Sequence, residues 1–436
     1  MKQTEEGLKR TIGVWGLTAN IVNIIVGAGI FVLPAIVAEN MGSTSLIAYL
    51  FCGLLIALIM LCFAEAGSKI PLSGGGYTYV ETAFGPFSGF LVAIFAIVGG
   101  ILADAAVANA LVDILGSAFP IFKQSGVRVF FLFIVFFGLA YINVIGVKQG
   151  IGLVKINTVT KLIPLLLIVL IGWKDVSIVN LYWESEPTLR QIGETSLILF
   201  FAFQGGEVGI NVGGEIINPK KTIPKAIFFS IGLVLAFYML IQTVAQGVLG
   251  EQLATFKAAP IAETANVIFG PIGFTILLIG GAISMFGNLS GEVLNNPRIL
   301  FATSRDKVIP IDLLARIHPK FRTPYISIII YAGIGLLLAI FGGFQLLVPL
   351  ATATVLLLYL GVVLAVIKLR STHKTQADEF KIPGGLTVPI LSAGIILYFL
   401  SNLTQQEIIG ISIFITVLCV IYGLIKIFKK VKLKKS

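Results

Sequence analysis

Charged residues and histidine are scarce in this chain. Aspartate, glutamate, lysine and arginine make up 12% of its 436 residues, and there are 2 histidines. A soluble protein carries about a quarter charged residues. His318 and His373 both fall in polar connections between apolar runs, which excludes a histidine-based catalytic or metal centre within a membrane. The sequence holds no nucleophile–base pair and no metal-ligand set, so neither an enzyme nor a bound cofactor is expected.

Cysteine is equally rare. Cys52, Cys62 and Cys419 each lie inside an apolar run. They are interpreted as small core residues, because a disulfide framework needs paired cysteines in exposed segments of an oxidising compartment.

Apolar residues are abundant: 57% of the chain is hydrophobic and the mean hydropathy is +1.00. Apolar runs of roughly 20 residues suit a bilayer core about 30 Å thick. The sequence therefore predicts an all-α integral membrane protein with twelve transmembrane helices. The runs are 12–38, 43–67, 86–115, 127–146, 150–173, 190–217, 224–249, 273–302, 325–342, 345–368, 386–403 and 406–428.

The net charge of +10 is unevenly distributed. If the N-terminus is cytoplasmic, most lysines and arginines fall on cytoplasmic connections, and few, such as Lys123 and Arg128, fall on outer ones. This bias predicts a multi-pass protein of the cell (plasma) membrane with both termini in the cytoplasm. The basic tail, Lys426 to Lys435, is interpreted as an anchor near anionic lipid and not as a nucleic-acid site. The first run is too long for a cleavable signal peptide.

Two of the apolar runs are interrupted by glycine. Gly27-Ala28-Gly29 interrupts the first run, and Gly205-Gly206, with Gly209 close by, interrupts the sixth. Unpaired backbone in lipid costs several kcal/mol per group, so such breaks are tolerated where the freed groups meet protein, water or a ligand. Paired broken helices in two halves indicate a transporter binding site. The chain is predicted to be one transmembrane transporter domain, 1–436, with inverted repeats at 12–173 and 190–368 and two additional helices at 386–428.

A helix break suits a substrate that carries a carboxylate and an ammonium on one carbon, as a free amino acid does. Half-helix N–H groups attract the carboxylate, and C-terminal carbonyls attract the ammonium. We assign the carboxylate to the N–H groups of Ala28 and Gly29, and the ammonium to the carbonyls of Ile25, Phe201 and Gln204. Glycines that only permit close helix packing are the alternative interpretation. The predicted substrate site comprises Ile25, Gly27, Ala28, Gly29, Phe201, Gln204, Gly205 and Glu207.

Five ordered motifs resemble those of the amino acid–polyamine–organocation (APC) superfamily. They cover roughly the first three quarters of the chain, in the right order and spacing, and they resemble those of L-amino acid transporter (LAT-like) proteins and related prokaryotic permeases. The motifs are Ile25-Val26-Gly27-Ala28-Gly29-Ile30-Phe31-Val32-Leu33-Pro34, Pro71-Leu72-Ser73-Gly74-Gly75-Gly76-Tyr77-Thr78-Tyr79-Val80, Phe201-Ala202-Phe203-Gln204-Gly205-Gly206-Glu207, Glu215-Ile216-Ile217-Asn218-Pro219-Lys220-Lys221 and Ile317-His318-Pro319-Lys320-Phe321-Arg322-Thr323-Pro324.

The resemblance implies a LeuT-type fold of five plus five inverted helices, with the first and sixth helices discontinuous. It implies secondary active transport of L-amino acids by alternating access, as an exchanger or a proton-coupled symporter. A same-fold carrier of polyamines or other organic cations is the alternative. Relatives that pair covalently with a glycoprotein carry a cysteine in the loop that corresponds to 116–126. This loop has none, so no disulfide-linked accessory subunit is expected.

The resemblance also implies roles for two aromatic residues and a lysine. Phe201, with Phe203 beside it, is expected to close the site from outside; filler in the core is the alternative. Many relatives carry Trp where this chain has Gly206, which leaves the pocket size open. Lys161 lies near mid-bilayer in the fifth run, where a lysine is costly and usually functional. Relatives place this ammonium where others bind sodium, and Ser284 and Asn288 are expected to accept hydrogen bonds from it.

Other ionisable residues lie in the runs. Lys155 is expected to snorkel to the cytoplasmic face. Asp104 is interpreted as a group of the outer vestibule or a proton carrier, and Glu207 as a pocket residue or a structural carboxylate. Glu215 and Glu292 are expected to form structural ion pairs with cytoplasmic basic residues.

Overall fold

The computed structural model describes residues 12–70, 74–145, 147–183, 185–210, 216–321, 323–372, 376 and 378–435. Within these ranges the chain is helical, with one isolated β-bridge between Ile12 and Ile216. The α-helices are α1 Val14–Ile25, α2 Gly29–Met41, α3 Ser45–Lys69, α4 Gly76–Phe84, α5 Pro86–Ala118, α6 Ser125–Ile145, α7 Val147–Ile171, α8 Leu189–Leu199, α9 Pro219–Leu249, α10 Pro260–Phe269, α11 Pro271–Asn295, α12 Pro297–Arg305, α13 Tyr325–Phe341, α14 Phe344–Thr372, α15 Thr387–Ser401 and α16 Gln405–Lys435.

Short 3-10 turns join these helices. They are η1 Gly42–Thr44, η2 Pro120–Lys123, η3 Gly172–Asp175, η4 Ile178–Leu181, η5 Phe200–Ala202, η6 Val208–Ile210, η8 Gly250–Thr255 and η9 Asp312–Ala315. Several long helices begin with proline, whose missing N–H is not needed in the first turn. Gly85 and Gly270, with φ of 86° and 72°, precede two of these prolines. A residue with a side chain is strained in that conformation.

Apart from 190–217, each predicted apolar run overlaps one α-helix or two consecutive α-helices, whereas the described part of 190–217 contains α8, η5 and η6. Among the described residues, seven stretches are long and apolar enough to cross a membrane, and α1, α13 and α15 are shorter apolar helices. The seven stretches are Gly29–Lys69, Pro86–Ala118, Ser125–Ile145, Pro219–Thr255, Pro271–Arg305, Phe344–Thr372 and Gln405–Ile427. The chain is thus a multi-pass helical membrane protein.

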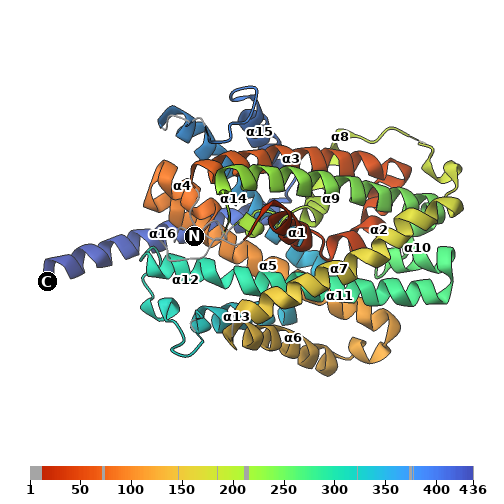
Figure 1. Cartoon of the computed structure of the whole chain (residues 1–436), viewed down its shortest axis with the longest axis horizontal. Coiled ribbons are helices and arrows are strands. Elements are labelled where there is room, and N and C mark those ends of the chain that lie inside the picture. The colour runs from red at the N-terminus through yellow and green to blue at the C-terminus, as the bar shows by residue number, and fades with distance from the viewer. Residues whose placement is uncertain are drawn as a thin grey trace.

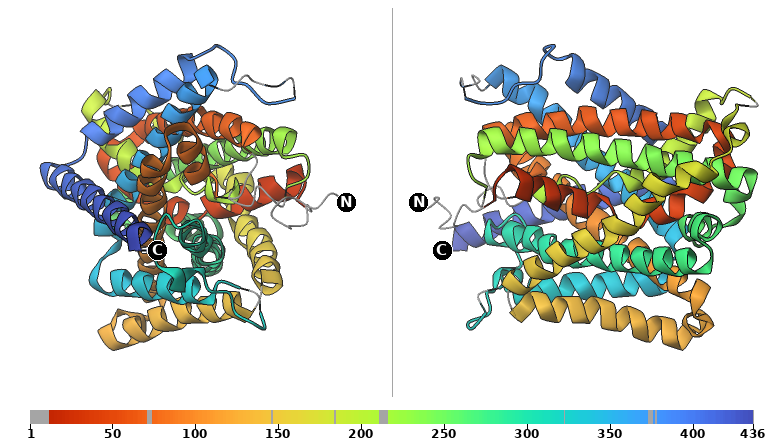
Figure 2. Two further views of the ribbon diagram at one scale, coloured as in Figure 1. Left: turned by 90° about the vertical axis from the view of Figure 1, so that its left-hand side faces the viewer. Right: turned by 45° about the vertical axis from the view of Figure 1, so that its right-hand side comes forward.

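The long helices lie side by side in one bundle (Figure 1). We call the end that holds α4, α12 and the C-terminal end of α16 the α4 end, and the opposite end the α10 end. The closest packing joins α5 with α14, α3 with α9 and α7 with α11. The exposed faces carry large apolar side chains, such as Phe130 and Ile272, which suits contact with lipid. Helix α16 lies at the edge of the bundle (Figure 2).

Candidate substrate site

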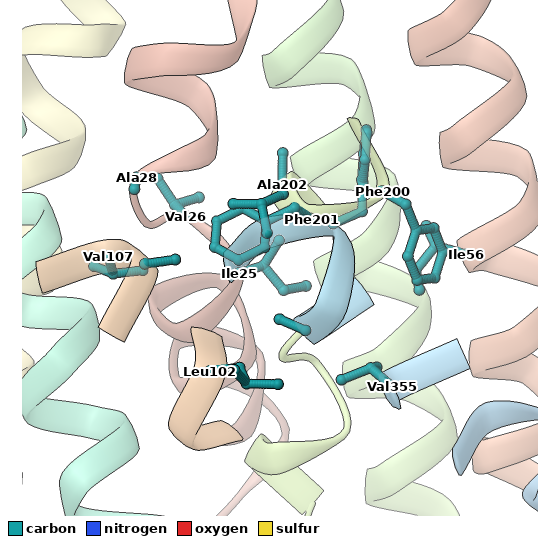
Figure 3. Close-up of a cluster of buried hydrophobic side chains, with 14 of the residues drawn as sticks. Ile25, Val26, Ala28, Ile56, Leu102, Val107, Phe200, Phe201, Ala202 and Val355 are labelled. Carbon is teal, nitrogen blue, oxygen red and sulfur yellow. The ribbon is translucent and has the colours of Figure 1, made fainter. Parts of the chain in front are cut away.

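The first helix break is present where the sequence predicts it. Helix α1 ends at Ile25 and α2 begins at Gly29, so Ala28 and Gly29 offer N–H groups from the start of a helix, where no intrahelical acceptor exists. A Cβ added to Gly29 would lie 2.5 Å from the Cβ of Ala202. Only glycine therefore permits this contact between the two broken segments. Figure 3 shows Ile25 and Ala28 beside Phe201 and Ala202.

The second break follows α8. The chain continues through η5, turns between residues 203 and 207, and enters η6. Gly205 has φ +100°, and a Cβ there would lie 2.9 Å from Cγ2 of Ile24 in α1. Each break thus packs a glycine against the other, which brings the freed backbone groups of both into one place. Residues 211–215, including Glu215, lie outside the described part of the chain.

A cavity lies at this junction. Its wall includes all eight residues of the predicted substrate site, together with residues of α5, α11, α12 and α14. The cavity also reaches Gly74, Gly76 and Tyr77 at the start of α4, so it extends from the breaks toward the α4 end. A second pocket lies on the side of the junction that faces the α10 end. Its wall includes Ile36, Phe344 and Lys257.

Lys161 ties α7 to the first break. Its side chain is fully buried, and its ammonium donates hydrogen bonds to the carbonyls of Asn23 at 2.5 Å and Val26 at 2.6 Å. These carbonyls belong to the end of α1, where the helix break frees acceptors and the partial charge is negative. The arrangement places a potential cation at the C-terminal end of a half-helix.

The expected hydrogen bonds from Lys161 to α11 are corrected by the structure. Ser284 donates to the Val26 carbonyl at 3.2 Å, and Asn288 donates to the Ile24 carbonyl at 2.7 Å. Both side chains are therefore donors to the same turn of backbone at the end of α1. The break leaves several carbonyl oxygens without a partner in the helix, and donors from both α7 and α11 bond them. The two helices therefore hold the turn jointly.

The two predicted gate residues occupy different places. Phe201 lines the cavity, and its ring lies edge-on to Phe344 of α14 with centroids 5.7 Å apart. Phe203 lies in the core, against Tyr238 at 5.1 Å and Tyr49 at 6.5 Å, and is not among the residues that line the cavity. Phe201 and Phe344, and not Phe203, therefore lie between the cavity and the second pocket.

Three carboxyl groups line the cavity. Glu207 accepts hydrogen bonds from the Gly205 N–H at 3.0 Å and from the Tyr359 hydroxyl. Asp104 lies in the wall of the cavity. Glu292 accepts from Asn296 at 2.6 Å, and the salt bridges of the described residues do not include it, so the expected ion pair is wrong. Burial within the bundle separates Glu292 from the basic connections. The side chain of Lys155 lies outside the described part.

Comparison with known proteins decides the family. Residues 12–425 match the family model "Amino acid permease". The chain belongs to this family. It is 31% identical to the serine/threonine exchanger SteT of Bacillus subtilis, over 98% of this chain and 99% of that protein. It is 30% identical to large neutral amino acids transporter small subunit 2 of Mus musculus, over 73% and 62%, and 26% identical to the branched-chain amino acid permease BcaP of Bacillus subtilis, over 96% and 94%.

Three aromatic residues of this permease site are absent from the sequence prediction. The Tyr238 hydroxyl lies 3.1 Å from both the Ile25 and the Ala202 carbonyls, so its single proton is shared between the two breaks. Tyr331 connects Asp104 with Asn296, and Phe344 faces Phe201. Each lies within or beside an apolar run, where no sequence pattern separates a site residue from one that only packs.

Tyr238 also changes the expected role of Ile25. The Ile25 carbonyl accepts from the Gly27 N–H at 2.9 Å as well as from Tyr238. Both lone pairs of this oxygen are therefore engaged. The carbonyls of Phe201 and Gln204 remain as the expected acceptors for an ammonium group.

Proposed function

We propose that this permease is a secondary active transporter of L-amino acids that works by alternating access. The observation that carries the proposal is the meeting of two broken helices, with their freed backbone groups, at one cavity in the bundle. The names of the relatives support amino acids as the substrate class, and none of these three names a polyamine.

The substrate carboxylate binds the N–H groups of Ala28 and Gly29, and its ammonium binds the carbonyls of Phe201 and Gln204. A Cβ at Gly27 or at Gly205 would lie about 3 Å from a side chain of α11 or of α1, so glycine lets these helices approach the two breaks closely. The N-terminal end of a half-helix carries a partial positive charge and the C-terminal end a partial negative charge, which suits the carboxylate and the ammonium of a zwitterion. The site thus recognises the part that all amino acids share and leaves the side chain to the rest of the cavity.

The transport cycle rests on a five-plus-five architecture with twelve crossings. In this proposal residues 12–173 and 190–368 are the inverted repeats, 386–428 adds two helices, and both termini lie in the cytoplasm of the plasma membrane. The α4 end is then cytoplasmic. The cavity reaches this end, and the Phe201–Phe344 pair closes the opposite side, which corresponds to a state open to the cytoplasm.

Lys161 stands in place of a coupling sodium ion. Its ammonium is held by two carbonyls that offer only lone pairs, an environment that stabilises a positive charge. A lysine that stays charged needs no ion from solution, so we propose exchange and not proton symport. One relative is named an exchanger. No disulfide-linked partner is needed for this cycle.

The test is uptake of labelled amino acids by purified protein in liposomes. Exchange predicts uptake that requires an amino acid inside and is unaffected by a pH gradient. Uptake into empty liposomes driven by a pH gradient would instead establish proton symport. Failure of every amino acid in the panel, by a protein that remains monodisperse, would contradict the proposed function.

A further inference from the structure

One wall of the cavity is acidic. Asp104 of α5 is 1% exposed and Glu292 of α11 is 7% exposed, and both line the cavity. A polar bridge joins them: the Asn296 amide donates to Glu292 at 2.6 Å and to the Tyr331 hydroxyl at 2.9 Å, and Tyr331 donates to Asp104 at 2.8 Å. Four side chains from three helices and the α11–α12 junction thus form one connected group.

The donors of this group are fully used. The two amide protons of Asn296 serve Glu292 and Tyr331, and the one hydroxyl proton of Tyr331 serves Asp104. The second carboxyl oxygen of Asp104 is buried without a hydrogen-bond partner in the described part of the chain. Among the described residues that line the cavity there is no lysine, arginine or histidine. Two buried carboxyl groups therefore depend on neutral donors alone, so a negative charge on either one has no cation beside it among these lining residues.

Space is kept open beside these carboxyl groups. The cavity face of α5 carries Gly99, Gly100 and Ala103 next to Asp104. A Cβ at Gly100 would lie 2.6 Å from the Asn296 amide nitrogen and 3.0 Å from the Tyr331 hydroxyl. Glycine thus preserves the bridge, and small residues leave room in the same cavity that contains the two helix breaks.

We propose that Asp104 and Glu292, bridged by Tyr331 and Asn296, form a subsite that binds the side-chain ammonium of a cationic amino acid such as lysine or ornithine. The inference rests on the proposed function, because the breaks must hold the α-carboxylate and α-ammonium while the side chain reaches the acidic wall. An ammonium group supplies the donors that the unpartnered oxygen of Asp104 lacks, and it neutralises the wall.

The test compares lysine with norleucine, which has the same carbon skeleton without the side-chain ammonium. Uptake of each labelled compound is measured in proteoliposomes loaded with the same amino acid, for the wild type and for Asp104→Asn. Asparagine keeps an oxygen that accepts from Tyr331 and removes the charge. The ratio of lysine to norleucine kcat/KM should fall by about tenfold or more, the factor expected for one charge-assisted hydrogen bond, with norleucine nearly unchanged.

Two further variants complete the experiment. Asp312→Asn makes the same change at an exposed position outside the cavity and should leave both rates unchanged. Glu292→Gln should reproduce the loss of lysine selectivity and replaces Asp104→Asn if that variant is unstable in gel filtration.

The subsite is refuted if wild-type protein takes up norleucine but neither lysine nor ornithine, or if Asp104→Asn lowers both rates equally. It is also refuted if norleucine uptake acidifies the liposomes in the wild type but not in Asp104→Asn, since the carboxyl would then carry a proton. Absence of uptake for every amino acid would overturn the proposed function itself, whereas norleucine uptake alone leaves that function intact.

Discussion

Replacing Lys161 by methionine tests whether its ammonium holds the first break in its transport-competent form. Methionine keeps most of the length and volume of the lysine stem while removing the charge. Two charge-assisted hydrogen bonds are lost, to the carbonyls of Asn23 and Val26, each worth about 1.5–3 kcal/mol. Ser284 still donates to the Val26 carbonyl, so the net loss corresponds to about one such bond. Since about 1.4 kcal/mol is tenfold in a population, turnover should fall by about tenfold to a hundredfold.

The assay is exchange of labelled amino acid in proteoliposomes, with thermal stability in detergent measured alongside. Lys161→Ala should lose at least as much turnover as Lys161→Met. The matched control is Lys225→Met, which alters an exposed lysine of α9 and should exchange like the wild type. Normal turnover by folded Lys161→Met protein would remove Lys161 from the mechanism.

Three further substitutions probe the same junction. Gly29→Ala places a methyl group 2.5 Å from the Cβ of Ala202 and should abolish uptake. Gly333→Ala, with nothing within 4 Å of its Cβ, should be tolerated. Equal uptake by both variants would contradict the close contact of the breaks. Tyr238→Phe removes the hydroxyl that is shared by the carbonyls of Ile25 and Ala202. It should cost about 1 kcal/mol of stability, measured as a lower melting temperature. An unchanged melting temperature and substrate affinity would show that this link between the two breaks is unimportant. Phe201→Ala removes the contact with Phe344 and should raise the KM for external substrate about fivefold, an effect that Phe130→Ala, on an exposed face, should not share.

Much of the fold follows from the pattern of apolar runs, because backbone in lipid has few alternatives to the helix. Gly27-Ala28-Gly29 also locates the first break, since two poor helix formers within an apolar run leave backbone groups that need partners. Lys161 is singled out by its depth in the fifth run, and its ammonium bonds the carbonyls of Asn23 and Val26 at this break and not the expected Ser284 and Asn288. Charge in a bilayer is so costly that a mid-membrane lysine must find acceptors.

The donors and acceptors of the site are less predictable. Ser284 and Asn288 carry groups that both donate and accept, and the sequence does not show that freed carbonyls outnumber the donors around them. Glu292 is expected to pair with a cytoplasmic basic residue, yet its side chain lines the cavity inside the bundle. Which face of a fully apolar helix meets the cavity depends on its neighbours, and composition does not record this.

The central claim is that the two helix breaks jointly bind an amino acid. A cryo-electron microscopy structure of the protein with a transported amino acid tests it most directly. The account predicts density at the junction, with the carboxylate about 3 Å from the amide nitrogens of Ala28 and Gly29 and the ammonium at the carbonyls of Phe201 and Gln204. Amino acid density elsewhere, with the junction unoccupied or the helices continuous through both glycine segments, would contradict it.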